Sequence, residues 1–171
     1  MKKITATSSR GKTQGIPLTP HLYVEGHYIV AKGGNLLLNI APGPEGTWPD
    51  GAYTLLEEMG EWMKVNSKAI YETRSLEPFK EGQVCLTQKQ DGTVYAIYLA
   101  EENESSMPSK IWLSSIQPKK GAKVTLLGLD KTLDWEKSGN GFYVDIPEKM
   151  RKNPPCKYAW VVEISSIEED E

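Results

Sequence analysis

The chain has 171 residues, of which 39% are hydrophobic and 25% charged, and its net charge is −3 at neutral pH. These values are typical of an ordinary globular protein of one domain, with room for a smaller second element. The slight acidic excess argues against a nucleic acid partner, which requires clustered basic charge. No apolar run approaches the ~20 residues of a membrane span, so a membrane partner is not expected either.

The N-terminal part of the sequence gives little structural signal. Its first twelve residues, MKKITATSSRGK, have the charge of a signal peptide but no apolar segment behind it, so they do not identify a compartment. Met1–Leu22 is polar with two prolines, which predicts a mobile arm or irregular coil. Tyr23–Ala31 is compatible with a short helix, although Gly26 weakens it. Residues 1–28 are therefore assigned to an irregular N-terminal arm.

Cysteine and histidine are too sparse to indicate a cofactor. Cys85 and Cys156 are expected to be buried thiols, and a single bridge between adjacent strands stays open as an alternative. His21 and His27 are six residues apart in a loop-like segment without flanking Cys or Asp, which makes a metal site improbable. No metal and no cofactor is predicted.

One βα unit follows the arm. Gly33–Gly46 reads GGNLLLNIAPGPEG, in which Leu36–Ile40 is an apolar run that predicts a strand buried on both faces between parallel neighbours. The Pro/Gly turn ends the strand. Asp50 is a good N-cap for a helix over Gly51–Val65, whose apolar residues recur at steps of three and four. Its opposite face is acidic, with Glu57 and Glu61.

After residue 70 the pattern changes to short runs with a period of two. Asp91-Gly92 joins two such runs, which is a strong hairpin signal. Seven strands at this spacing predict an antiparallel β-sandwich over residues 70–171, after a βα unit over residues 29–69. The expected strands are Gln83–Gln90, Thr93–Ala100, Lys110–Leu113, Lys123–Leu127, Leu133–Lys137, Gly141–Ile146 and Tyr158–Ile164.

Several ordered motifs resemble the α-L-fucosidases of glycoside hydrolase family 29. Gly33–Pro42 matches the last barrel strand of that family, Gly60–Trp62 matches its G-x-W helix end, and Asn66–Arg74 matches the passage into its C-terminal domain. The resemblance extends to about Ile164, with departures at Ser67 and Lys68. It implies that residues 29–69 are the terminal βα unit of a (β/α)₈ barrel and that a β-sandwich follows.

The resemblance also implies a retaining glycosidase acting on terminal α-L-fucosyl linkages of fucosylated glycans. Such an enzyme uses an Asp nucleophile and a second carboxylate as acid/base, both carried by earlier barrel strands and loops. No residue of this sequence matches either position, so we expect a C-terminal fragment, from a split or truncated gene, that is inactive alone. The acidic residues present as candidates are Glu45, Asp50, Glu57, Glu58 and Glu61, of which Glu57 and Glu61 share one helix face that is expected to be solvated.

Two residues are expected to face the catalytic side of the barrel. In a TIM barrel the loop after each strand lies on that side, which predicts substrate contacts for Asn39 and Trp48. For Asn39 the alternative is a buried structural amide, and for Trp48 it is packing under the loop. The family's usual secreted, periplasmic or lysosomal location does not assign a compartment to this chain.

Two other roles stay open. The sandwich is alternatively a non-catalytic carbohydrate-binding or structural module, for which the candidate aromatic residues are Trp112, Trp135, Tyr143 and Trp160. The N-terminal segment is expected to expose strand edges and apolar faces. It therefore predicts either self-association or complementation by a second chain that supplies the missing barrel.

Overall fold

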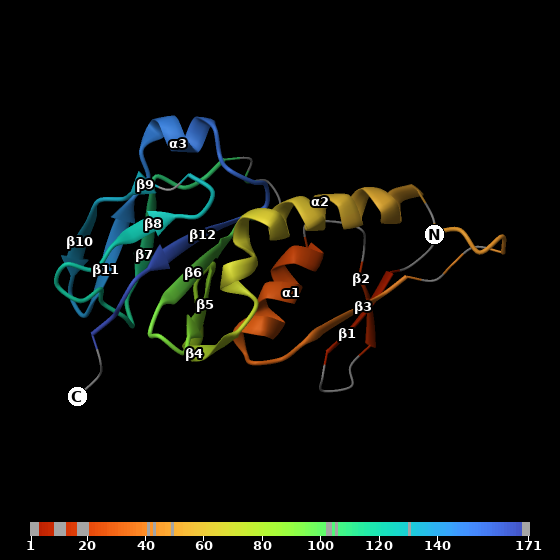
Figure 1. The fold of residues 1–171 in the computed structure, drawn as a ribbon, viewed down its shortest axis with the longest axis horizontal. Coiled ribbons are helices and arrows are strands. Elements are labelled where there is room, and N and C mark those ends of the chain that lie inside the picture. The colour runs from red at the N-terminus through yellow and green to blue at the C-terminus, as the bar shows by residue number, and fades with distance from the viewer. Residues whose placement is uncertain are drawn as a thin grey trace.

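The computed structural model describes residues 4–8, 13–16, 21–40, 42, 44–48, 50–101, 104, 106–129 and 131–168, with side chains described from residue 26 onward. Figure 1 shows a β-rich body at one end, two helices beside it, and a small sheet at the other end. The elements in chain order are β1 (Ile4–Ser8), β2 (Thr13–Ile16), α1 (His21–Ala31), β3 (Leu36–Asn39), α2 (Asp50–Asn66), the 3₁₀ turn η1 (Ser67–Ala69), β4 (Thr73–Glu81), β5 (Val84–Lys89), β6 (Val94–Leu99), β7 (Lys110–Leu113), β8 (Val124–Leu126), β9 (Lys131–Thr132), β10 (Trp135–Ser138), β11 (Gly141–Asp145), α3 (Glu148–Lys152) and β12 (Ala159–Ile164).

The C-terminal body is the predicted antiparallel sandwich. Its larger sheet has the strand order β4-β5-β6-β12-β8-β9 and its smaller sheet the order β10-β11-β7. Side chains from both sheets, including Leu86, Val162, Ile111 and Phe142, form one buried core between them. The predicted hairpin is confirmed as β5 and β6, joined at Asp91-Gly92, where Gly92 has a φ of +91° and Asp91 Oδ1 accepts a hydrogen bond from the Thr93 amide.

The larger sheet is buried on both faces, whereas a sandwich exposes the outer face of each sheet. Its outer face carries Cys85, Tyr95 and Ile97, which pack against Trp62 and other residues of the helices and their flanking turns in a second core. This explains why β6 and β12 are apolar along nearly their whole length and do not alternate, as strands covered on both sides do. The prediction of alternating runs is wrong for these central strands.

Three other elements were not anticipated from the sequence. β4 and β9 are additional strands, and α3 is a short helix between β11 and β12. β9 is only two residues long and β4 contains a register shift between Ser75 and Lys80, so neither has the clean period of two that identifies a strand. The helix predicted over Gly51–Val65 is confirmed as α2, one residue longer at each end.

The N-terminal sheet corrects three expectations. Residues 1–28, predicted to be an irregular arm, contain β1, β2 and most of α1 in their described part. β3 pairs with β1 in antiparallel register, with Leu38 opposite Ala6, and not with parallel neighbours. β3 is also buried on one face only: Leu36 and Leu38 pack against the second core, whereas Leu37 is 66% exposed. The proposed domain boundaries stay a prediction.

The turn between α1 and β3 depends on glycine. The Gly33 amide donates to the Val30 carbonyl at 2.8 Å and the Gly34 amide to Ile29 at 2.9 Å, which closes the end of α1. Gly33 has a φ of +76°, the left-handed conformation that favours glycine at this position. Within the described residues, no helix is both long and apolar enough to cross a membrane.

Candidate functional site

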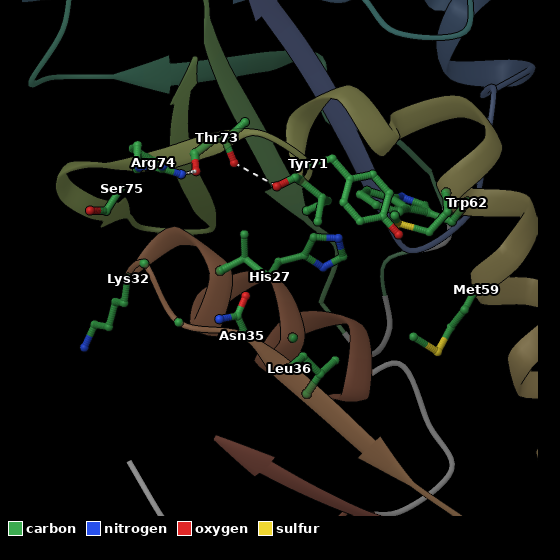
Figure 2. Close-up of a pocket in the computed structure, with 16 residues that line it drawn as sticks. His27, Lys32, Asn35, Leu36, Met59, Trp62, Tyr71, Thr73, Arg74 and Ser75 are labelled. Atoms are coloured by element: carbon green, nitrogen blue, oxygen red, sulfur yellow. Dashed lines mark hydrogen bonds between the residues drawn. The ribbon is translucent and has the colours of Figure 1, made fainter. Parts of the chain in front are cut away.

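A cavity of about 720 Å³ lies between α1, the start of β3, α2 and β4 (Figure 2). Leu36, Met59 and Trp62 supply apolar walls, and Lys32 and Arg74 supply positive charge. Figure 2 shows the Lys32 side chain pointing away from the centre of the cavity, while His27 and Trp62 lie at its inner end. The amphipathic helix α2 provides Met59 and Trp62 because they belong to its apolar stripe.

His27 and Trp62 fix the inner end of this cavity. Their rings meet edge to face with centroids 4.4 Å apart, and both side chains are buried, with 6% and 4% of their surface exposed. Trp62 Nε1 donates a 2.8 Å hydrogen bond to the Ala159 carbonyl of β12. This bond ties α2 to the larger sheet, so Trp62 has a structural role that its position in the cavity alone would not reveal.

The cavity does not contain the groups that glycoside hydrolysis needs. No Asp or Glu is found among its described lining residues, whereas a retaining glycosidase needs two carboxyl groups about 5–5.5 Å apart. The cavity also lies at the beginning of β3, while barrel active sites lie at the carboxyl ends of the strands. Across the described part of the chain, no three His, Cys, Asp or Glu side chains form a cluster able to hold a metal ion.

The described carboxyl groups elsewhere do not form a catalytic pair. Glu57 and Glu61 are exposed on α2, as the sequence predicts. Partial burial raises the pKa of the Glu81 carboxyl, but hydrogen bonds from Ser114 and Ser115 outweigh it and leave the pKa below its usual value. The Thr93 amide likewise lowers the pKa of Asp91. A general acid requires the opposite shift.

The two predicted substrate-contact residues lie at the other end of β3 from the cavity. Asn39 is the last residue of β3 and is exposed, so the structure does not place it as a buried amide. Trp48 is 41% exposed and its ring lies 5.6 Å from that of Tyr53 at the start of α2. In the sequence, Asn39 ends β3 and Trp48 follows in the segment before α2. Contact of either residue with a substrate stays a prediction.

The four candidate aromatic residues of the sandwich separate into two pairs. Trp160 is 2% exposed in the core, and Trp135 packs edge to face on buried Phe142. Trp112 is 56% exposed, and its ring lies 4.7 Å from that of Tyr143 on the outer face of the smaller sheet. The period of two in β7, where Ile111 and Leu113 are buried, is the sequence signal that places Trp112 outside.

Both cysteines are free thiols, so the disulfide alternative is wrong. Burial raises the pKa of Cys85 to about 11. Burial also raises the pKa of Cys156, although a hydrogen bond from Asn66 partly opposes it. Since the thiolate is the nucleophilic form, neither cysteine is activated for chemistry.

Comparison with known proteins supports one family over most of the chain. Residues 27–68 match the sequence profile of α-L-fucosidase and residues 78–165 match that of the α-L-fucosidase C-terminal domain. An α-L-fucosidase of Branchiostoma floridae is 35% identical over 142 residues, and the human plasma α-L-fucosidase is 35% identical over 144. Each alignment covers 81% of this chain and 30% of the relative, so the chain spans about a third of the length of these curated relatives.

Solved structures give the same fold. The Thermotoga maritima α-fucosidase superposes with a TM-score of 0.72 at 24% identity, covering 89% of this chain and 35% of that enzyme. The Paenibacillus thiaminolyticus α-L-fucosidase isoenzyme 1 gives a TM-score of 0.69 at 25% identity, covering 92% and 36%. Since residues 27–68 and 78–165 match the two sequence profiles in order, the chain belongs to the α-L-fucosidase family.

Proposed function

We propose that this chain supplies the closing βα unit and the C-terminal sandwich of a retaining α-L-fucosidase that acts on terminal α-L-fucosyl linkages of fucosylated glycans. The observation that carries the proposal is the ordered match of residues 27–68 and 78–165 to the two parts of that family. The 171 residues contain no matched nucleophile or acid/base, so the chain by itself is inactive.

The direct test is hydrolysis of 4-nitrophenyl α-L-fucoside. The purified chain releases no 4-nitrophenol above the rate of a buffer blank. When it is mixed with a second chain that carries the barrel of a close relative, release begins and follows the concentration of the complex. Activity of the chain alone contradicts its inactivity. Failure of every barrel chain to restore activity, when a complex has formed, contradicts the fucosidase role.

The partner surface proposed for this assembly is the apolar part of the N-terminal unit. It carries exposed Leu37 at 66%, Tyr53 at 46% and Trp48 at 41%, around β3 and the start of α2. Figure 1 shows the β1–β3 sheet at the far end of the molecule from the sandwich, where a second chain has access to it. The Trp48 and Tyr53 rings lie 5.6 Å apart, and large exposed apolar side chains favour association.

We expect a barrel-supplying chain to cover this surface and expect self-association in its absence. Light scattering of the pure chain then gives a mass above the monomer value, and Leu37→Asp shifts it toward the monomer. Thr132→Asp, an exposed change on β9 at the edge of the larger sheet, serves as the charge-matched control. A monomer at high concentration contradicts the self-association.

A second candidate function is a non-catalytic carbohydrate-binding module, since Trp112 is exposed on the smaller sheet. Sugar binding by the pure chain without any hydrolysis on reconstitution would favour it over the first proposal. Absence of binding to fucosylated and non-fucosylated oligosaccharides would leave only a structural role for the sandwich.

A further inference from the structure

The outer face of the smaller sheet carries a row of side chains that the fold itself does not use. In the strand register, Trp112 of β7 lies opposite Tyr143 of β11, and Tyr143 lies opposite Glu136 of β10. Phe142 and Val144 point the other way and are fully buried, so the row faces outward. Figure 1 places this sheet at the end of the molecule opposite to β1–β3, well away from the predicted barrel contacts.

The row is held in one arrangement by contacts among its own members. The Trp112 and Tyr143 rings are 4.7 Å apart at an interplanar angle of 41°. The Tyr143 hydroxyl donates a short hydrogen bond to Glu136. Lys110 Nζ lies 3.7 Å from the centre of the Tyr143 ring and pairs with Asp145 at 3.1 Å. A surface fixed in this way loses little conformational entropy when a ligand binds.

A groove of about 700 Å³ adjoins the exposed indole. It lies between the edge of the smaller sheet and the β4–β5 turn, and its lining includes Trp112, Lys110, Gln83, Ser138 and Tyr98. The volume falls within the range of about 300–1,000 Å³ that is usual for small-molecule sites. An exposed aromatic ring beside amide, hydroxyl and ammonium groups offers both an apolar platform and hydrogen-bond partners.

We propose that Trp112 and Tyr143 form a glycan-stacking platform that binds a neutral pyranose unit. The carbon–hydrogen face of a pyranose ring is apolar and stacks on an indole ring, while its hydroxyl groups reach Glu136, Ser138 and Lys110 at the rim. The proposal rests on the proposed function for the choice of a fucosylated glycan as ligand.

The charges around the platform favour a neutral ligand. Lys110 is already paired with Asp145, and the surrounding acidic groups are Glu136 on the sheet and Glu81 in the groove. Nucleic acid bases also stack on aromatic rings, but single strands require a positively charged groove along their phosphates. The carboxylates of Glu136 and Glu81 also repel phosphorylated and sulfated ligands. An uncharged polyhydroxylated ring is therefore the best match.

The test is a titration of the full 171-residue chain with 2′-fucosyllactose and with lactose, followed through the tryptophan indole N–H resonances. We expect the Trp112 resonance to shift and saturate with a Kd of about 1 mM. Trp112→Ala weakens binding by at least ~10-fold, and Trp112→Tyr, which keeps an aromatic platform, recovers part of it. Tyr71→Ala removes another exposed aromatic side chain, outside the platform, and leaves binding unchanged.

Four results would overturn the platform: no saturable shift with either sugar, equal losses in Trp112→Ala and Tyr71→Ala, unaltered binding in Trp112→Ala, or tighter binding of a single-stranded oligonucleotide. Circular dichroism of each variant checks that the fold persists. The outcome is separable from that of the proposed function. Sugar binding without hydrolysis on reconstitution overturns the fucosidase role alone, whereas hydrolysis without binding at Trp112 overturns the platform alone.

Discussion

The two ends of this molecule differ in how far their β-strands are buried. The larger sheet of the sandwich is covered on one face by the smaller sheet and on the other by the helices, so Leu86 and Ile97 are both fully buried. In β3, by contrast, only one face packs against the second core, and Leu37 on the other face is 66% exposed. The larger sheet is therefore covered within this chain, whereas β3 keeps a large apolar side chain exposed on its second face.

The largest expected effect is in the core between the two sheets. Phe142→Ala removes a fully buried ring and lowers the free energy of unfolding by about 3–5 kcal/mol. Leu37→Ala, the matched truncation in β3, changes it by less than about 0.5 kcal/mol because that side chain is largely exposed. Urea denaturation of both variants measures the contrast. A similar loss in the free energy of unfolding for both variants would contradict the difference in burial between the two ends.

The second effect concerns the hydrogen bond that joins α2 to the larger sheet. Trp62→Phe keeps an aromatic ring in place but leaves the Ala159 carbonyl without its 2.8 Å partner. We expect a loss of about 1–3 kcal/mol, because this hydrogen bond is lost and the smaller ring leaves part of the buried indole volume empty, while the Cys156 thiol still donates to the carbonyl at 3.1 Å. Hydrogen exchange of α2 amides should accelerate more than exchange in β6. Trp48→Phe, at an exposed tryptophan, is the control, and uniform acceleration across both regions would contradict the local role.

The sequence allows the sandwich to be predicted far better than the N-terminal sheet. Asp91-Gly92 and the apolar stripe of α2 are local signals, and both led to the correct element. The antiparallel pairing of β3 with β1 is a contact between distant segments, and nothing in the polar sequence of Ile4–Ser8 indicates it. A single run such as Leu36–Ile40 does not reveal which of its faces finds a partner.

The candidate sites show the same limit. The period of two in β7 places Trp112 outward, so the exposure of this residue can be predicted from the sequence. Its position opposite Tyr143 follows from strand register, which no local motif specifies. The cavity beside β3 was not predicted, because it brings together residues of α1, α2 and β4 that are far apart in the chain.

The smallest expected effect concerns the hydrogen bonds that join the two sheets of the sandwich at their edge. Glu81, the last residue of β4, accepts hydrogen bonds from the Ser114 amide at 2.7 Å and hydroxyl at 2.6 Å, and from the Ser115 amide at 3.1 Å and hydroxyl. These bonds link the larger sheet to the end of β7. We expect Glu81→Gln to lower the free energy of unfolding by about 1–2 kcal/mol near neutral pH.

The pH dependence of this contact has a definite sign. The folded-state pKa of Glu81 lies below its ordinary value of 4.5, so the folded protein binds fewer protons there than the unfolded chain. The stabilisation is therefore complete above that ordinary pKa and is lost as the pH falls through the folded-state value. Urea midpoints measured between neutral pH and about pH 3 should converge for the wild type and Glu81→Gln. A difference that persists or grows in acid would mean that the glutamate acts through packing and not through its charge.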